Sequence, residues 1–410
     1  MHDLLPEDEA LFEHVVDTAT RVARSFDYHL IRTPIVEDVG VFLRSVGDES
    51  DIVSKEMYVF EDRGGERLAL RPEGTAGVAR AYLEHGMASR PQPVRLFYWG
   101  PFFRYDRPQA GRYRQLHQFG VECIGDPSPT ADVEVIELQR EIYRALGLDD
   151  LVLRINSIGT ASTRRTYEAA LREHFRPHLD GLSADSQRRF EANVLRILDS
   201  KEDARHPAVL GAPSILDSLD GEDRAHWDGV RAGLDGLGIP YEVDPRIVRG
   251  LDYYAHTVWE FEPANAGGQS TVGAGGRYDG LIETLGGPHT PGVGWATGLE
   301  RIMLLLRERG IEGGGARTLD AVTIPLGDAG AAACARLAST LRAEGFAVRG
   351  GTPGRSMRAA LRAADASGAR YALIIGDREA AEGVVQVKPL LDGSEQVTMP
   401  LAEVAARLRV

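Results

Sequence analysis

The sequence has few of the features that mark disulfide-bonded, secreted or membrane proteins. Only two cysteines occur among 410 residues, Cys123 and Cys334. They lie far apart and lack Cys-x-x-Cys or Cys/His spacing, which argues against a disulfide framework and against a protein-held structural metal site. No run of about 18 apolar residues exists, so no membrane span is expected. Met1 leads into the acidic segment HDLLPEDEA rather than a secretion signal. We therefore expect two plain buried thiols and a cytoplasmic protein.

Positive charge is also scarce overall, but it is unevenly distributed. The formal net charge is −14, whereas residues 318–410 hold 11 Lys/Arg against 10 Asp/Glu. Within the acidic remainder, residues 91–121 contain five arginines, eight aromatic residues and a single acid, Asp106. Net charge alone therefore does not exclude a nucleic-acid partner, because a local basic and aromatic patch is present.

The apolar spacing predicts more than one domain. Residues 7–26 repeat apolar side chains at helical intervals, which predicts a long first helix. The segments RLFYWGPFFRY and RQLHQFGVECIG, with the short loop DRPQAGRY between them, predict an antiparallel hairpin. Residues 160–240 are charged and helix-forming, which indicates a helical insertion. Residues 309–317 form a glycine-rich linker, and residues 318–410 alternate strand and helix as a small α/β domain.

The second strand of the hairpin carries an unusual polar face. Strand alternation places Gln118, Gly120 and Glu122 on one side and the apolar residues between them on the other. An amide and a carboxylate beside a residue with no side chain leave room for a small ligand. The alternative, a solvent-facing side of a half-exposed sheet, stays open at this point.

Arginines and tyrosines alternate around the hairpin loop. Arg104 ends the first strand, and Arg107, Arg112 and Arg114 follow with Tyr105 and Tyr113 among them. This mixture suits contact with phosphates and stacking on bases, and its alternative is a solvated loop.

Two further segments are candidates for substrate contact. In LRPEGT, Glu73 and Thr75 could bind an ammonium group, but Glu73 is more simply explained as a cap for the following helix. In GVGWATGLERIMLLL, glycines precede a helix that begins near Arg301. The spacing fits neither a dinucleotide fingerprint nor a P-loop. Arg301 could contact a base or a terminal phosphate, or it could be an ordinary solvated helix residue.

The stretch RGLDYYAHTVWEF places Arg249, Asp252, Tyr253 and Tyr254 directly before an alternating apolar strand. Periodicity explains the strand but not its polar beginning. Together with FFRYDRPQAGRYRQLHQFGVECIG and GVGWATGLERIMLLL, this stretch closely resembles the histidyl-tRNA synthetases of the class II aminoacyl-tRNA synthetases. The resemblance covers nearly the whole chain. RGLDYY and HQFGVECIG are its histidine-specific parts.

The resemblance implies an α+β protein and a ligase. The expected class II catalytic domain, residues 1–317, has an antiparallel sheet with flanking helices and a helical insertion that contacts the tRNA acceptor arm. Residues 318–410 would form the anticodon-binding domain. The expected protein is a homodimer that catalyses two steps. In the first, L-histidine reacts with ATP to give histidyl-adenylate and pyrophosphate, with Mg²⁺ on the polyphosphate. In the second, histidine is transferred to the 3′-terminal adenosine of its tRNA.

The resemblance also implies roles for single residues. The substrate ammonium is expected at Glu73, Thr75 and Gln118, the imidazole between Glu122 and Tyr254, and Tyr253 beside them. Arg249 would bind the reacting carboxylate and α-phosphate, with Asp252 fixing its turn. Arg104, Asp106, Arg112 and Arg301 would bind ATP, and Arg107 and Arg114 the tRNA acceptor end; Arg104, Gln118 and Arg249 are the expected catalytic residues.

Two departures from the family pattern concern its class-wide parts. The class has Arg-x-Glu where this chain has Arg104-Tyr105-Asp106. The aspartate is one methylene shorter, so a water is expected between it and the adenine amino group. The family also begins several residues earlier than Met1, which indicates either a misassigned start or a missing N-terminal strand.

Two rival functions share much of this pattern. The synthetase-like regulatory subunit of ATP phosphoribosyltransferase keeps the fold without aminoacylation, but it lacks an anticodon-binding domain. A class II synthetase for another amino acid would keep Arg104 and Arg301, yet it would have no use for Glu122 with Tyr254. The C-terminal domain argues against the regulatory subunit, and Glu122 with Tyr254 argues against a synthetase for another amino acid.

Overall fold

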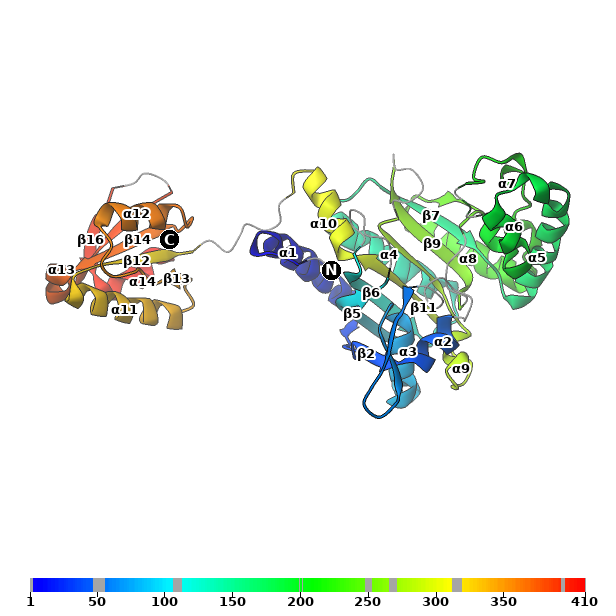
Figure 1. Cartoon of the computed structure of the whole chain (residues 1–410), viewed down its shortest axis with the longest axis horizontal. Helices are drawn as coiled ribbons and strands as arrows, with labels where there is room; N and C mark the ends of the chain where they lie inside the picture. The colour runs from blue at the N-terminus through cyan, green and yellow to red at the C-terminus, as the bar shows by residue number, and fades with distance from the viewer. Residues whose placement is uncertain are drawn as a thin grey trace. The chain divides into compact units, whose positions relative to one another are not determined.

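A computed structural model describes residues 3–46, 56–105, 113–198, 200, 202–247, 253–264, 271–311, 319–391 and 395–409. The chain divides into two compact units, Met1–Gly313 and Gly314–Val410 (Figure 1). Each unit has its own sheets and its own hydrophobic clusters.

The N-terminal unit contains helices α1 (Pro6–Ser25), α2 (Val39–Val46), α3 (Thr75–Glu84), α4 (Pro129–Ala145), α5 (Ala161–Phe175), α6 (Ala184–Ala192), α7 (Pro207–Leu210), α8 (Gly221–Gly236), α9 (Leu281–Thr284) and α10 (Leu299–Glu308). Its strands are β1 (His29–Leu30), β2 (Val36–Asp38), β3 (Tyr58–Glu61), β4 (Arg67–Leu70), β5 (Val94–Phe103), β6 (Gln115–Ile124), β7 (Leu151–Ser157), β8 (Glu242–Val243), β9 (Ala255–Pro263), β10 (Gly273–Arg277) and β11 (Gly292–Gly298).

The large sheet of this unit has the strand order β1-β5-β6-β11-β10-β9-β7-β8. Its neighbouring strands are antiparallel except at the two edges, where β1 and β8 pair in parallel. The predicted hairpin is confirmed: β5 and β6 pair from Val94 with Ile124 to Phe103 with Gln115. A second, three-stranded sheet has the order β2-β4-β3. Pro34 lies between β1 and β2, where no ladder N–H is needed.

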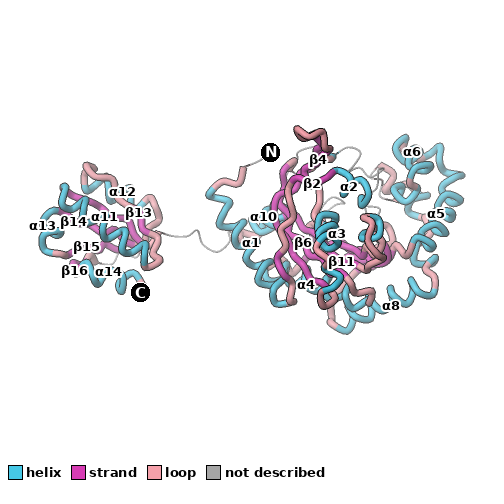
Figure 2. Tube along the Cα trace, turned by 90° about the horizontal axis from the view of Figure 1, so that it is seen from below, coloured by secondary structure: helices cyan, strands magenta, loops and turns pink. Residues whose placement is uncertain are grey.

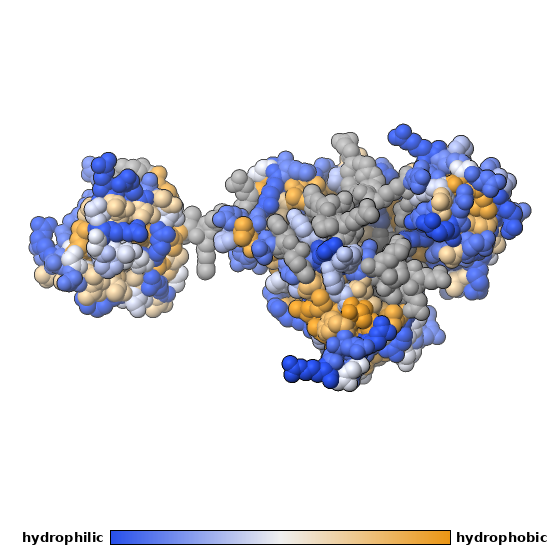
Figure 3. Space-filling view, in the orientation of Figure 1, coloured by the Kyte–Doolittle hydropathy of each residue, from blue (hydrophilic) through white to orange (hydrophobic). Residues whose placement is uncertain are grey.

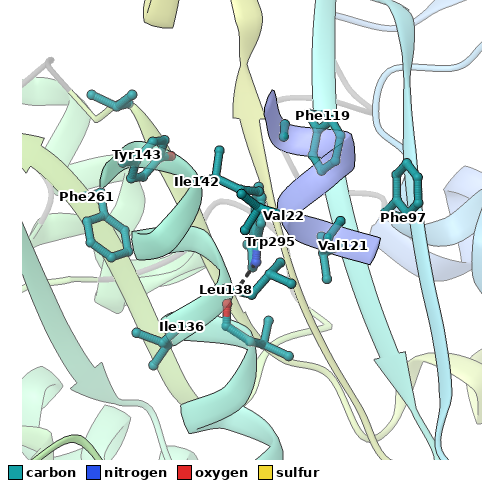
Figure 4. Packing of buried hydrophobic residues seen from close by; sticks show 14 of the residues in the cluster. Val22, Phe97, Phe119, Val121, Ile136, Leu138, Ile142, Tyr143, Phe261 and Trp295 are labelled. Atoms are coloured by element: carbon teal, nitrogen blue, oxygen red, sulfur yellow. Dashed lines mark hydrogen bonds between the residues drawn. The ribbon is translucent and has the colours of Figure 1, made fainter. Parts of the chain in front are cut away.

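The two faces of the large sheet are covered by different elements. Helices α1, α4 and α10 pack on one face, where Phe97, Phe119, Val121 and Trp295 belong to the largest hydrophobic cluster (Figure 4). The indole N–H of Trp295 donates to a carbonyl of α4 at 3.0 Å. Figure 2 shows the strands lying between α1 and α10 on one side and α2 and α3 on the other. The second face therefore also turns toward protein rather than water.

A buried ion pair fastens α4 to β10. Arg277 and Asp132 are both fully buried, and Arg277 Nε donates to Asp132 Oδ2 at 3.0 Å. Burial raises the pKa of Asp132, but the charge of Arg277 and the hydrogen bonds from His226 and Arg277 together outweigh it and bring the value down to about 2. His226 Nε2, from α8, lies 3.4 Å from the same carboxylate. Asp132 thus links α4 with β10 through an ion pair and with α8 through His226.

The segment between β7 and β8 is built from helices. Its described elements are α5, α6, α7 and α8 with short 3₁₀ turns, and α5 to α7 share a hydrophobic cluster of their own. Figure 1 shows α5, α6 and α7 gathered at one end of the unit.

The C-terminal unit is a small α/β domain, as predicted, and the pairing of its strands is mixed. Its sheet has the order β13-β12-β14-β15-β16, with the first three strands parallel and the last two antiparallel. The strands are β12 (Ala321–Leu326), β13 (Val348–Arg349), β14 (Tyr371–Gly376), β15 (Val384–Pro389) and β16 (Val397–Pro400), and the helices are α11 (Asp328–Ala343), α12 (Met357–Asp365), α13 (Asp377–Glu382) and α14 (Val404–Leu408).

The structure confirms the expectation for the two cysteines. Cys123 and Cys334 are both buried thiols, and burial raises their pKa values to about 12 and about 11. Among the described residues, no helix combines the length and the apolar character needed to cross a membrane.

Candidate active site

The carboxylate of Glu122, on β6, is the centre of the candidate site. It is 0% exposed. Its Oε1 accepts hydrogen bonds from Thr75 Oγ1 at 2.8 Å and the Tyr98 hydroxyl at 3.1 Å, and its Oε2 accepts one from Tyr278 at 2.6 Å. Burial raises the pKa of Glu122 to about 8, although the three hydroxyl donors favour the charged form. The interpretation of this strand face as solvent-exposed is therefore wrong.

Glycines make the space for this carboxylate and for Tyr98. A Cβ at Gly294, on β11, would lie 1.9 Å from Glu122 Oε2. A Cβ at Gly120, on β6, would lie 2.3 Å from the Tyr98 ring, and one at Gly74 would meet the same ring at 2.3 Å. Real Cβ atoms do not approach so closely, so only glycine leaves room for these polar side chains on the sheet.

Glu73 caps α3, and it does so from a buried position. Its Oε2 accepts the backbone N–H of Thr75 at 2.6 Å, and its Oε1 accepts that of Ala76 at 2.9 Å. The cap interpretation is thus confirmed, and it does not exclude a ligand. A carboxylate has about four acceptor positions, of which these two bonds occupy two. Burial raises the pKa of Glu73, while the two amides and the charge of Arg104 oppose the rise.

Four tyrosines surround the two carboxylates. Tyr253 and Tyr254 are buried, with ring centroids 4.7 Å apart, and Tyr253 also meets the edge of Tyr278 at 5.9 Å. Burial raises the pKa of Tyr98, Tyr253 and Tyr278 well above the usual range. Their hydroxyls therefore stay protonated at neutral pH and act as donors.

Two arginines fix the loop that carries Glu73. Arg104, at the end of β5, donates from Nε to the Pro72 carbonyl at 2.8 Å. Arg71 is buried and donates to the Pro101 carbonyl at 2.9 Å. Arg104 consequently lies beside the site, as predicted, and Arg71 attaches the same loop to β5.

Gln118 lies farther along the Glu122 face of β6, between Gly100 of β5 and Gly298 of β11. Neither neighbour carries a side chain. The Oε1 atom of Gln118 is buried and has no hydrogen-bond partner among the described residues. A buried acceptor without a partner is costly, so this atom is suited to receive a donor from a ligand.

The first turn of α10 is tied to β6. The Glu300 carboxylate accepts the backbone N–H of His117 at 2.9 Å, and His117 Nδ1 lies 2.8 Å from it. The next residue, Arg301, is half-buried and donates to the Thr271 carbonyl at 2.8 Å. Arg301 therefore has a defined position at the sheet, unlike a fully solvated helix arginine.

The remaining predicted site residues divide into two groups. The Arg114 guanidinium carbon lies 4.0 Å from the centroid of the Tyr105 ring. Outside the described residues lie Asp106, Arg107, Arg112, Arg249 and Asp252.

Known proteins resemble both units of the chain. The family model for histidyl-tRNA synthetase matches residues 1–302, and that for an anticodon binding domain matches residues 320–410. The histidine–tRNA ligase of Geobacillus thermodenitrificans is 46% identical over 409 residues, which is 99% of this chain and 96% of that protein. The chain belongs to the histidyl-tRNA synthetase family. The ligase of Rhodospirillum rubrum, 48% identical over 98% of this chain and 95% of its own, is a further relative.

Solved structures agree with this assignment. The apo histidyl-tRNA synthetase of S. aureus is similar with a TM-score of 0.84 and 37% identity, covering 100% of this chain and 98% of that one. A protein of Bacillus halodurans described as an ATP phosphoribosyltransferase regulatory subunit/histidyl-tRNA synthetase has a TM-score of 0.66 and 22% identity, over 92% and 97% of the two chains. At that identity the likeness concerns the fold alone. The predicted family, fold class and enzyme class are confirmed.

Three buried residues of this synthetase site were not predicted to belong to it. Tyr98 sits in the apolar run RLFYWGPFF, which is typical of core. No local pattern distinguishes Tyr278 or Arg71 as site residues. The one usable signal was strand alternation, because Tyr98 has the same parity on β5 as Gly100, which pairs with Gln118.

The raised pKa of Glu122 predicts a pH-dependent stability. Because the folded state binds this proton more tightly than the unfolded chain, the contribution of Glu122 to the free energy of unfolding falls as pH rises from about 5 to 8. Glu122→Gln has no such proton to lose. We expect the Tm of this variant to rise relative to the unchanged protein across that range, measured by thermal melts without histidine.

The matched control for this measurement is Glu13→Gln, at an exposed position of α1. Its Tm difference from the unchanged protein should stay constant with pH. A constant difference for Glu122→Gln as well would contradict the raised pKa.

Proposed function

We propose that the N-terminal unit activates L-histidine with ATP, releases pyrophosphate and transfers histidine to the 3′-terminal adenosine of the tRNA for histidine. The C-terminal unit, residues 318–410 in the predicted division, binds the anticodon. The observation that carries the choice of amino acid is the fully buried Glu122 carboxylate, held among hydroxyl donors on a glycine-lined sheet face.

The imidazole of histidine is selected by hydrogen bonds at both ring nitrogens. Glu122 has three hydroxyl donors and about four acceptor positions, so one position on Oε2 remains for a ring N–H. The Tyr254 hydroxyl contacts the other nitrogen, and Tyr253 packs beside it. A side chain without two ring nitrogens would leave these buried groups unsatisfied, which gives strong discrimination.

The ammonium of histidine lies at the end of α3. Each Glu73 oxygen has one backbone donor and keeps an acceptor position. Thr75 Oγ1 donates to Glu122 and can still accept, and Gln118 Oε1 is a buried acceptor awaiting a donor. These three residues provide acceptors of the kind that a charged N–H group requires.

Fixed cations support the reaction at the α-phosphate. The carboxylate oxygen of histidine forms a bond to the α-phosphorus of ATP while the bond to pyrophosphate breaks. Arg249 bridges the two reacting groups and Arg104 binds the α-phosphate, which stabilises the charge that develops on the oxygens. Arg301 lies against the adenine and the γ-phosphate. Arg112 contacts ATP, and Asp106 reaches the adenine amino group through a water. Arg107 and Arg114 contact the tRNA acceptor end.

Magnesium enters this proposal only with ATP. Among the described residues, no group of three or more His, Cys, Asp or Glu side chains could hold a metal ion. The two carboxylates of the site already accept hydroxyl or amide hydrogen bonds. These residues do not fit a protein-held metal, so Mg²⁺ would arrive on the phosphates and neutralise their charge.

An uncovered apolar face supports the proposed homodimer, which we place in the cytoplasm. In the three-stranded sheet, Val36 pairs with Leu70, and Phe60 with Leu68, so all four share one face. Val36 and Phe60 are each 42% exposed. Figure 3 shows an apolar patch over this part of the unit. A second copy of the chain is the occupant that we propose for it.

ATP–pyrophosphate exchange tests the choice of amino acid. With each amino acid in turn, we expect exchange with histidine alone, and only when Mg²⁺ is present. Histidine binding by calorimetry without any exchange would instead favour the regulatory-subunit function, and exchange with a different amino acid would reject the roles of Glu122 and Tyr254.

Arg249 is tested by its effect on the chemical step. Arg249→Ala should slow histidine-dependent exchange by about 100-fold or more, because the removed cation acts mainly in the transition state. The KM for ATP should change much less. Steady-state exchange measures both, and an unchanged exchange rate would remove Arg249 from the mechanism.

The homodimer is tested by placing a charge on the apolar face. Phe60→Glu should weaken self-association by about 30-fold or more if Phe60 lies near the centre of the interface. Sedimentation velocity over a range of concentrations measures this. Leu237→Glu, at a position that is 51% exposed after α8, is the control. Equal sedimentation of the two variants would place the dimer interface elsewhere.

A further inference from the structure

The helical segment between β7 and β8 contacts the backbone of the site at Tyr254. Arg164, in the first turns of α5, is half-buried and donates a hydrogen bond from its guanidinium to the Tyr254 carbonyl. A hydrogen bond from a charged group is stronger than one between neutral groups. This hydrogen bond therefore connects α5 directly to Tyr254, the residue that is proposed to contact the imidazole.

The backbone just after Tyr254 is hydrogen-bonded to the connection between β7 and α5. The backbone N–H of His256 donates to the Gly159 carbonyl at 3.0 Å, and the N–H of Ile158 donates to the His256 carbonyl at 2.8 Å. His256 has a φ of 50°, a left-handed conformation that is unfavourable for a residue with a side chain. Such a conformation persists only where neighbouring contacts determine it, and these bonds provide them.

The same connection is fixed from α8. Asp223 is fully buried and accepts hydrogen bonds from the Thr160 backbone N–H at 3.0 Å and hydroxyl at 3.1 Å, and from the Thr163 hydroxyl. Asp223 Oδ1 lies 3.1 Å from His256 Nδ1, although neither atom satisfies the geometry of a hydrogen bond there. The first turn of α5, and Arg164 with it, is thus held in place by a second helix.

The Tyr254 ring has little freedom on its other side. A Cβ at Gly276, on β10, would lie 2.6 Å from the ring, so the ring packs directly on the strand backbone. Tyr253 packs beside it, with the two ring planes tilted by 52°. With the ring placed between these surfaces, the position of its hydroxyl depends on where the Tyr254 backbone is held.

We propose that Arg164 is a positioning residue for histidine selection, which holds the Tyr254 backbone so that the tyrosine hydroxyl meets the imidazole nitrogen. The proposal rests on the proposed role of Tyr254. Arg164 touches neither histidine nor ATP in this scheme. It gives the helical segment a part in choosing the amino acid.

The first test compares neighbouring arginines of one helix. Arg164→Met should raise the KM for histidine in ATP–pyrophosphate exchange by about 10- to 100-fold, the effect of losing a hydrogen bond from a charged donor. The KM for ATP should stay unchanged, and Arg164→Lys, which keeps a charged donor, should restore part of the loss. Arg165→Met, at an exposed position one residue on, is the control and should leave both values unchanged.

A double-mutant cycle separates positioning from general destabilisation. Tyr254→Phe should raise the KM for histidine strongly in the unchanged protein but only slightly in Arg164→Met, because the hydroxyl is already misplaced there. Equal effects in both backgrounds would overturn the positioning role, as would an unchanged histidine KM in Arg164→Met. If Tyr254→Phe has no effect in the unchanged protein, the proposed function of Tyr254 fails instead, together with the inference that depends on it.

Discussion

The burial of one carboxylate, Glu122, is the constraint on which the site depends. A buried carboxyl group is unfavourable unless hydrogen-bonding partners surround it, and here three hydroxyls from three separate segments do so. These segments are the start of α3, strand β5 and the turn after β10. The hydrogen bonds to Glu122 therefore join the segments of the unit that also carry Glu73 and Arg104.

The opposite face of the sheet makes this arrangement stable. It is filled with large apolar side chains, and a buried ion pair, Arg277 with Asp132, links β10 to α4. Apolar burial on one side lets the sheet hold its shape while the other side carries glycines and charges. This difference between the faces follows from strand alternation, because successive residues of β6 point in turn to the apolar core and to the site.

Local sequence was sufficient for α1, for the hairpin of β5 and β6, and for the polar face of β6. Helical spacing predicted α1, and the short polar loop predicted the hairpin of β5 and β6. Local sequence could not show that the Glu122 face is buried, because helix α3, which packs on that face, comes from elsewhere in the chain. Nor could it find Tyr98 or Tyr278 as donors to Glu122, since partners separated by 24 and 156 positions leave no local pattern. The specific roles came from resemblance to a family rather than from periodicity.

The glycines of the sheet change how sequence variation in this protein should be interpreted. Gly294 carries no functional group, yet an alanine there would add one carbon 1.9 Å from the Glu122 carboxylate. The change from glycine to alanine is usually regarded as conservative, but here the added carbon would displace the Glu122 carboxylate from its position. Variants of uncertain effect at such glycines should be weighed as heavily as those at the charged residues they accommodate.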